Sequence, residues 1–286
     1  MPAQKIVNAD QAEFWSSTTG AQWVELQDRI DTLLSGVLDR LLSKADVTPG
    51  QSVLDIGCGT GASVLALCER VGPEGAVEGL DIAAQMLERA RERAQAAGHG
   101  NARFTLSDAQ VHPFAPRQYD QVVSRFGVMF FEDTVAALGN IARAVKPGGR
   151  MTFACWGRMA DNPWFEVPRA AAIAELGAVP PADPYAPGPM AFHDKDHVLG
   201  LFRQAGITEV RAEEVELPLF PYGDVATAAE TASSIGPASR IIREKGGTPA
   251  DAQAIAKRVA VEFERYATPQ GVQVPARLNY YSARVS

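Results

Sequence analysis

Hydrophobic residues in the N-terminal part of the chain recur at helical spacing. Between residues 26 and 42, leucine, isoleucine and valine stand three and four positions apart, which places them on one face of a helix. We therefore expect a helical segment over residues 9–44, ended by Thr48-Pro49-Gly50.

Beyond residue 50, short apolar runs alternate with helical patterns. The runs predict strands at residues 52–56, 76–80, 102–106, 119–124 and 150–155, and the segments between them predict helices at 60–70, 83–97 and 134–145. Repeated strand and helix units of this length favour a parallel sheet covered on both faces, because their crossovers are right-handed. The pattern predicts a doubly wound α/β fold with a mostly parallel sheet.

The pattern loosens after residue 156. A proline-rich stretch at residues 180–190 is too rigid and irregular for a helix, so we expect a surface insertion there. A helix at 195–205 and a sixth strand at 207–213 follow. Residues 224–267 read as helical in two pieces, and residues 278–285 form a last strand that completes seven.

Composition and charge limit the classes of function. The chain has 286 residues, of which 46% are hydrophobic and 21% charged, and no apolar run approaches the ~18 residues of a membrane span. The N-terminus lacks the pattern of a secretory signal, so we expect a cytoplasmic protein. A net charge of −7 argues against nucleic-acid binding, which rests on clustered Lys and Arg; the expected partner is a small molecule.

Cysteine and histidine spacing predicts no metal site. Cys58, Cys68 and Cys155 form no metal-spaced set and read as reduced thiols. His193 and His197 stand at i and i+4, on one face of a helix, but two ligands do not make a site.

The stretch VLDIGCGTG, residues 53–61, predicts a ligand-binding loop. Gly57, Gly59 and Gly61 permit positive φ and let a ligand lie against bare backbone. A dinucleotide and S-adenosylmethionine both use such loops, but no glycine follows three positions after Gly59, as the dinucleotide fingerprint requires. Asp55, just before the loop, would repel a pyrophosphate and attract the ammonium of a methionine moiety. The sulfonium cofactor fits better.

Two further acids end the next predicted strands. Asp81 lies twenty positions after Gly61, where an acidic side chain accepts hydrogen bonds from ribose hydroxyls. In LSDAQ, Asp108 is placed to accept from an adenine amino group, and Ala109 to give its backbone N–H to the ring. Three strand ends would then converge on one nucleoside.

On these motifs the chain resembles the class I S-adenosylmethionine-dependent methyltransferases, in particular their ubiquinone/menaquinone C-methyltransferase-like branch. VLDIGCGTG, GLDIA, LSDAQ and VKPGGRMTF occur in the family's order from residue 53 to residue 153. The resemblance implies a Rossmann-like seven-stranded sheet with an N-terminal helical lid and a helical insertion. It also implies S-adenosyl-L-methionine as cofactor and S-adenosyl-L-homocysteine as product.

The motifs and the resemblance together define an expected site. The cofactor-binding set is Trp23, Asp55, Gly57, Cys58, Gly59, Gly61, Asp81, Ile82, Met86, Asp108, Ala109, Arg125 and Phe126, with Phe14 and Trp15 as further lid residues. The acceptor set is Arg125, Met129, Phe130, Trp156 and His193, and His193 is a candidate general base because it follows the proline-rich insert.

The expected segments follow from the same assignment. Residues 1–48 form the lid, 49–156 the cofactor-binding core, 157–222 the substrate-side insert with strand six, and 223–286 the helical insertion with the last strand. The predicted reaction is in-line methyl transfer to a small, largely apolar acceptor with an oxygen, nitrogen, carbon or sulfur nucleophile. An NAD-dependent oxidoreductase and a non-catalytic cofactor-binding regulator remain as alternatives, and dimerisation through the helical insertion stays open.

Overall fold

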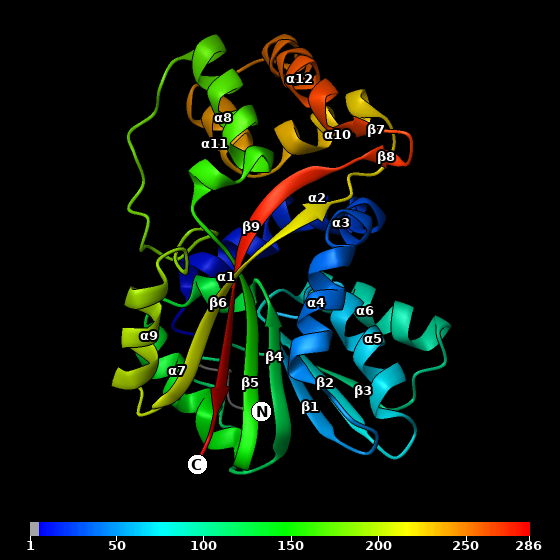
Figure 1. Cartoon of the computed structure of the whole chain (residues 1–286), viewed down its shortest axis with the longest axis vertical. Coiled ribbons are helices and arrows are strands. Elements are labelled where there is room, and N and C mark those ends of the chain that lie inside the picture. The colour runs from blue at the N-terminus through cyan, green and yellow to red at the C-terminus, as the bar shows by residue number, and fades with distance from the viewer. Residues whose placement is uncertain (1–5) are drawn as a thin grey trace.

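A seven-stranded sheet forms the centre of the lower half of the molecule (Figure 1). The computed structural model describes residues 6–286. The strands follow the order β3-β2-β1-β4-β5-β9-β6. Their bounds are β1 Ser52–Ile56, β2 Ala76–Asp81, β3 Ala102–Leu106, β4 Tyr119–Arg125, β5 Val145–Trp156, β6 Glu209–Leu219 and β9 Val274–Arg284. Only β9 runs antiparallel to its neighbours, so the predicted seven-stranded, mostly parallel sheet is confirmed.

Helices cover both faces of the sheet, as a doubly wound fold requires. On one side lie α4 (Ser35–Ala45), α5 (Ala62–Val71) and α6 (Ala84–Ala96), and on the other α7 (Thr134–Ala144) and α9 (Lys195–Gln204). In β1, Val53 belongs to one hydrophobic cluster while Leu54 and Ile56 belong to another. Successive strand side chains point to opposite faces, so this apolar run is buried on both sides.

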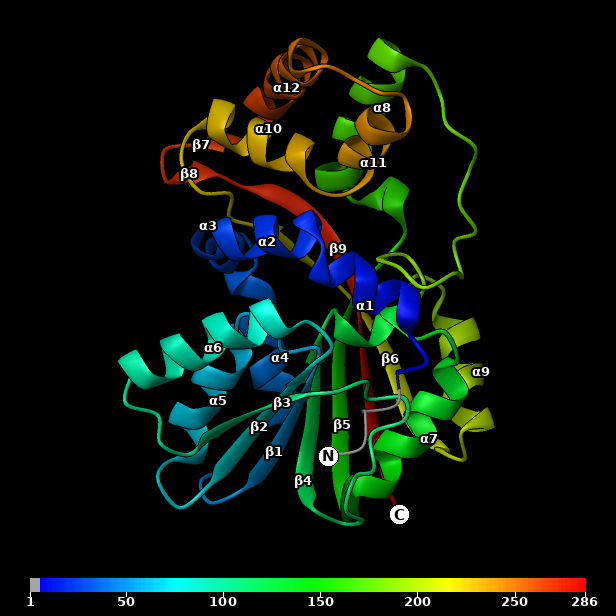
Figure 2. The same cartoon turned by 180° about the vertical axis from the view of Figure 1, so that it is seen from behind.

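The N-terminal segment forms four helices where the sequence predicted one. These are α1 (Ala9–Ser16), α2 (Thr18–Glu25), α3 (Gln27–Leu33) and α4. Ser17 is extended and its Oγ accepts from the Thr19 N–H, while Leu26 and Leu34 leave helical geometry. These breaks turn the chain, so α1 and α2 lie across the sheet's upper edge (Figure 2).

A helical roof stands above the sheet and the N-terminal helices (Figures 1 and 2). It contains α8 (Pro163–Leu176), α10 (Val225–Ser234), α11 (Pro237–Glu244), α12 (Pro249–Phe263) and the short hairpin β7 (Ala267–Thr268) and β8 (Gly271–Val272). The sequence did not predict α8. For residues 224–267 it predicted two helical pieces, and the structure has three, α10, α11 and α12. The additional break falls at Gly236, whose φ is +75°. Trp164 of α8 stacks on Phe263 of α12 at 6.0 Å and joins the roof helices.

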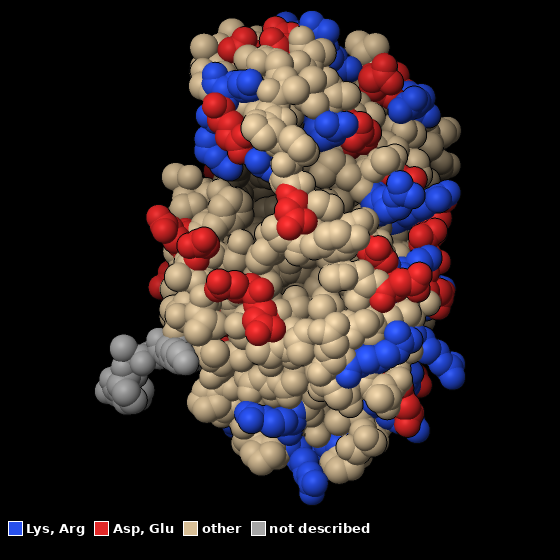
Figure 3. All heavy atoms as spheres, turned by 90° about the vertical axis from the view of Figure 1, so that its left-hand side faces the viewer, with Lys and Arg blue, Asp and Glu red and all other residues tan. Residues whose placement is uncertain are grey.

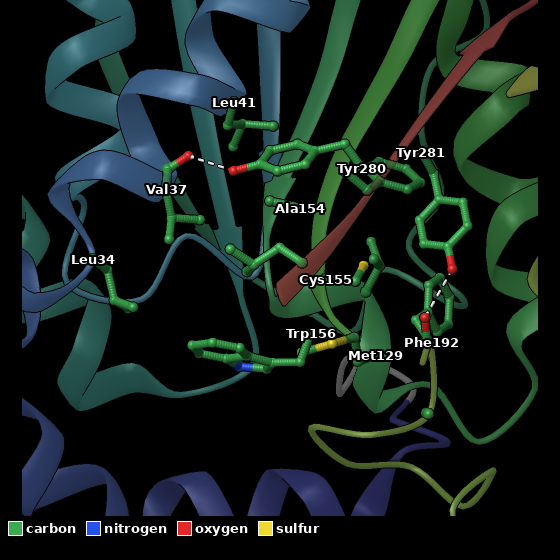
Figure 4. Packing of buried hydrophobic residues seen from close by; sticks show 14 of the residues in the cluster. Leu34, Val37, Leu41, Met129, Ala154, Cys155, Trp156, Phe192, Tyr280 and Tyr281 are labelled. Atoms are coloured by element: carbon green, nitrogen blue, oxygen red, sulfur yellow. Dashed lines mark hydrogen bonds between the residues drawn. The ribbon is translucent and has the colours of Figure 1, made fainter. Parts of the chain in front are cut away.

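Side chains of the last strand, β9, bind segments on both faces of the sheet. Tyr280 and Tyr281 point to opposite faces of β9 (Figure 4). The Tyr280 hydroxyl donates to the Val37 carbonyl in α4 at 3.2 Å, and the Tyr281 hydroxyl donates to the Phe192 carbonyl at 2.8 Å. Within residues 6–286, no helix combines the length and the apolar character that crossing a bilayer requires.

Candidate active site

One large cavity lies between the sheet, the N-terminal helices and the roof. Its volume is about 1040 Å³, at the upper end of the roughly 300–1,000 Å³ that ligand pockets occupy. Its walls include the glycine loop, the ends of β2 and β4, the helices α1, α2, α8 and α11, and the segment between α8 and α9. Figure 3 shows the surface hollowed on the side of that last segment.

The glycine loop has the predicted conformation. Gly57, Gly59 and Gly61 have φ values of +66°, +53° and +87°. A Cβ on Gly57 would lie 2.6 Å from the Cα of Gly127, so a larger residue would push the loop away from β4. A Cβ on Gly59 would meet nothing within 4 Å, which leaves open space where a ligand can lie against the backbone.

Gly61 serves packing rather than the cavity wall. It does not line the cavity, and a Cβ there would lie 3.0 Å from the Cβ of Ala90 in α6. Its left-handed backbone also delays the start of α5 to Ala62, two residues later than predicted. The predicted ligand contact is therefore corrected to a helix-packing role.

Asp55 lies beneath the loop, away from the cavity surface. Its side chain is fully buried, its Oδ2 accepts from the Ser63 hydroxyl, and its Oδ1 has no partner within residues 6–286. Burial raises the pKa of Asp55 to about 7, against the opposing effects of Ser63 and Arg125. Ser63, not Asp55, lines the cavity. In the structure Ser63 thus lies between Asp55 and the cavity, where the sequence had placed Asp55 itself.

Asp81 lies where the sequence placed it, on the cavity wall at the end of β2. One carboxylate oxygen accepts from the Gly59 N–H at 2.8 Å and the other from the Ala83 N–H at 2.9 Å. Burial raises the pKa of Asp81, and these backbone donors oppose the shift. Each oxygen keeps a second lone pair, which suits a pair of hydroxyl donors.

Asp108 has other partners than the predicted adenine. Its Oδ2 accepts from the N–H groups of Val7 and Asn8 at 2.9 and 3.0 Å, and its Oδ1 from Asn8 Nδ2 at 2.7 Å and the Gln110 N–H at 3.0 Å. Four donors use the roughly four lone-pair positions of a carboxylate. In this conformation Asp108 holds the N-terminal segment, and adenine binding by Asp108 stays a prediction. Asn8 also accepts from the Glu132 N–H at 2.6 Å.

Arg125 is held by an acid that sequence analysis missed. Its Nη2 lies 3.7 Å from Asp31 Oδ1, and Arg93 Nη2 lies 2.7 Å from Asp31 Oδ2. Burial lowers the pKa of Arg125, while Asp31 and Asp55 oppose the change. The Arg125 Nη1 is buried without a partner among the described residues. Asp31 belongs to no sequence motif, and only folding brings α3 to the end of β4.

Aromatic side chains from distant segments form the rest of the wall. Phe126, with φ of +71°, stacks on Trp156 at 4.5 Å with an interplanar angle of 5°. Trp15 makes edge contacts with Trp23 at 5.6 Å and with Phe130 at 5.5 Å. The cavity is also lined by several residues of the predicted site, namely Phe14, Cys58, Ile82, Met86, Ala109, Met129 and His193. The roof adds unpredicted residues, among them Trp164, Phe165 and Ile235.

The cavity wall contains no obvious metal centre. Residues 6–286 hold no group of three or more His, Cys, Asp or Glu arranged to bind a metal ion. Its polar groups are the carboxylates, the guanidinium and the backbone N–H groups described above, which suit an organic ligand.

Comparison with known proteins matches residues 53–149 to a family model described as a methyltransferase domain. The chain is 40% identical over 114 residues to aklanonic acid methyltransferase DauC of Streptomyces sp. strain C5, covering 40% of this chain and 52% of that protein. It is 36% identical over 109 residues to the demethylmenaquinone methyltransferase of Geobacillus kaustophilus, covering 38% and 47%. The matches thus span about half the length of these relatives.

The fold comparison extends over nearly the whole chain. The crystal structure of the [4+2]-cyclase SpnF superposes with a TM-score of 0.57 at 16% identity, covering 94% of this chain and 95% of that one. At this identity the likeness concerns the fold alone. Residues 53–149 therefore form a methyltransferase domain, and the chain is similar in this region to the methyltransferases named above.

Proposed function

We propose that the protein transfers a methyl group from S-adenosyl-L-methionine to a small, largely apolar acceptor. One observation carries the proposal: a single cavity joins the glycine loop and Asp81 to a group of aromatic side chains. This group, here called the aromatic chamber, consists of Phe126, Phe130, Trp156 and Phe165. A cofactor at the loop and an acceptor in the chamber would share that cavity, which is the requirement for direct transfer.

The loop end of the cavity fits this cofactor. The open space above Gly59 admits a ligand against the backbone, and Asp81 has acceptor capacity for two ribose hydroxyls. The unpartnered Nη1 of Arg125 suits the methionine carboxylate. Ile82 and Met86 supply apolar wall for the base.

The chain's contribution to the reaction is binding and orientation. When bound, the cofactor supplies a methyl carbon activated by its positively charged sulfur. The protein holds both reactants in one orientation, which replaces a bimolecular encounter, and the lid and roof limit the access of water. The carboxylate of Asp81 on the cavity wall favours a cationic over a neutral ligand.

The aromatic chamber supports an acceptor with a flat ring system. Trp156 at the end of β5 stacks on Phe126 and makes an edge contact with Phe165 of the roof. Aromatic faces pack well on planar ligands. The relatives are named for aklanonic acid and demethylmenaquinone. An acceptor such as a quinone is our proposal for this chain as well, with the methylated atom left to an acceptor screen.

Titration calorimetry with S-adenosylmethionine, S-adenosylhomocysteine and NAD tests the cofactor. We expect the first two to bind and NAD not to. The substitution Asp81→Asn should weaken S-adenosylhomocysteine binding about 10- to 100-fold, because hydrogen bonds to a charged group contribute about 1.5–3 kcal/mol. An exposed acid, changed in Asp224→Asn, serves as control. Tight NAD binding without a response to either sulfur compound would instead support the oxidoreductase alternative.

Transfer itself requires a second measurement. Labelled methyl groups should move from the cofactor to ring-containing acceptors in a metabolite extract. Binding of the cofactor without any such transfer would support a regulatory binding protein.

We further propose that the enzyme acts in the cytoplasm on a free small molecule rather than on nucleic acid. Three unpaired, buried cysteines suit a reducing compartment, and the net charge of −7 disfavours a phosphate backbone. A homodimer through the helical roof is part of the same proposal, and light scattering of the purified protein tests it.

A further inference from the structure

A long segment at residues 177–194, here called the strap, connects α8 of the roof to α9 beside the sheet (Figure 1). Five of its prolines line the cavity, together with His193 near its end. The Gly188 N–H donates to the Met129 carbonyl at 3.0 Å, which anchors the strap beside the end of β4. The strap therefore forms one wall of the cavity beside the aromatic chamber.

The ring of His193 is held in one tautomer. Its Nδ1 lies 2.7 Å from the carbonyl oxygen of Met190. A carbonyl only accepts hydrogen bonds, so Nδ1 carries a proton. In the neutral ring, Nε2 then has a free lone pair.

A clamp from the last strand holds the backbone of His193. Asn279 Nδ2 donates to the carbonyls of His193 and Phe192 at 2.9 and 3.2 Å, and the Tyr281 hydroxyl donates to Phe192 at 2.8 Å. Asn279 pairs with Cys155, one residue before Trp156 in the cavity wall. The clamp thus places His193 at the same end of β5 as the aromatic chamber.

Asn279 has no visible role besides this clamp. Its side chain is fully buried among apolar neighbours, and its Oδ1 has no partner among the described residues. An unsatisfied buried acceptor costs about 1–3 kcal/mol. An apolar residue would avoid that cost but would remove the donor to the His193 carbonyl, so the asparagine at this position serves to tie β9 to the strap.

We propose that His193 is the general base for an acceptor with an aromatic hydroxyl, and that Asn279 is its positioning residue. The inference rests on the proposed methyl transfer. The proton of the acceptor hydroxyl passes to Nε2 of His193, and the acceptor oxygen keeps the electron pair of the O–H bond. This oxygen then bonds to the methyl carbon. The bond between the methyl carbon and sulfur breaks, and its electron pair stays on sulfur. Histidine accepts protons near neutral pH, which suits a phenol or a hydroxyquinone.

Titratable groups near His193 lie on the strap and on α9. On the strap, Tyr185 lies 5.3 Å from the His193 ring between centroids, and Asp194 is the adjacent carboxylate. On α9, His197 contacts the same Tyr185 ring at 4.5 Å. The clamp residues of β9 and the anchoring Met129 are uncharged. Asp194 is therefore the carboxylate next to His193, and the His197 backbone N–H, together with the nearby His193 ring, lowers the pKa of Asp194.

The ionisation of a bound phenol tests the proposal without turnover. The probe is para-nitrophenol, added to the complex with S-adenosylhomocysteine, and the readout is phenolate absorbance against pH. We expect the bound probe to ionise at a lower pH than the free probe. His193→Asn keeps a donor for the Met190 carbonyl and removes Nε2, so it should abolish this shift. His197→Asn, on an exposed residue outside the cavity wall, should leave it unchanged.

The possible outcomes distinguish a wrong assignment of His193 from a wrong assignment of the methyltransferase function. A phenolate shift that persists in His193→Asn overturns the assignment, as does a probe that fails to bind the wild-type complex. Failure of S-adenosylhomocysteine to bind at all would reject the methyltransferase proposal itself. With a phenolic acceptor, His193→Asn should slow transfer about 10²- to 10⁴-fold at neutral pH, with unchanged cofactor affinity.

Asn279→Leu tests the clamp. It should displace His193 and move the pH dependence of probe ionisation toward that of His193→Asn, while cofactor affinity stays the same. If this variant unfolds, Tyr281→Phe removes one clamp hydrogen bond with little change of shape and should give a smaller shift in the same direction. Wild-type pH dependence in both folded variants would reject the positioning role.

Discussion

At the residue scale, burial controls the chemistry of Asp55. Its carboxyl is fully buried beneath the glycine loop, and its pKa is raised to about 7 because the charged form is desolvated. The unfolded chain loses this proton near pH 4 while the folded chain keeps it to about pH 7. Stability therefore falls as pH rises through this window and levels off above it.

Removing the charge should remove that pH dependence. We expect Asp55→Asn to gain free energy of unfolding relative to the wild type as pH rises from 4 to 7, by up to about 4 kcal/mol. Urea unfolding at several pH values measures the difference. A constant difference across the range would contradict the raised pKa.

Asp224 provides a control of opposite sign. It caps α10, and the Thr227 backbone N–H lowers its pKa. Its contribution is present above the unfolded pKa and is lost as pH falls. Asp224→Asn should therefore be destabilising at neutral pH and approach the wild type in acid.

At the element scale, Asn8 is the latch of the N-terminal lid. It joins Asp108 to the Glu132 backbone, and α1 itself has no buried residue. Loss of these buried hydrogen bonds costs about 1–3 kcal/mol. We expect Asn8→Ala to speed amide hydrogen exchange in α1 about 10- to 100-fold, with little change in the sheet.

The same measurement separates the two roles considered for Asp108. If Asp108 holds the lid, Asp108→Asn should resemble Asn8→Ala in its exchange pattern. If Asp108 instead binds adenine, Asp108→Asn alone should weaken S-adenosylhomocysteine binding while exchange in α1 stays slow. Asp10→Asn, on the exposed face of α1, controls for the local sequence change.

At the scale of the whole molecule, the roof and the sheet share one cavity and one hydrophobic cluster. Phe263 of α12 is fully buried and stacks on Trp164. Trp164 lines the cavity, whereas Phe263 does not. We expect Phe263→Ala to destabilise the fold by about 3–5 kcal/mol and to weaken acceptor binding more than cofactor binding, as measured by denaturation and calorimetry. Val261→Ala, on a residue that is 72% exposed in the same helix, should stay within about 0.5 kcal/mol. Equal losses of affinity for the acceptor and for the cofactor would show that the roof also supports the cofactor end of the cavity.

Local sequence patterns were sufficient for the core of the fold. Apolar runs and glycine turns predicted the strands and the order of strand and helix units, because a buried parallel strand needs a continuous apolar run. The positive φ values of the glycine loop and the place of Asp81 at a strand end follow from the same short stretch. Local patterns do not reveal contacts between segments far apart in the chain, so the roles of Asp31 and Asn8 could not be predicted.

The sequence by itself determined the α/β sheet, the ligand loop and the match to a methyltransferase domain, since each rests on residues close together in the chain. Only the tertiary structure decided that Ser63 stands between Asp55 and the cavity, that Asp108 holds the lid, and that β9 clamps His193. These contacts join segments far apart in sequence or depend on which side chains remain exposed after packing. Spacing along the chain carries no signal for either, because burial and long-range hydrogen bonds arise only when the elements assemble.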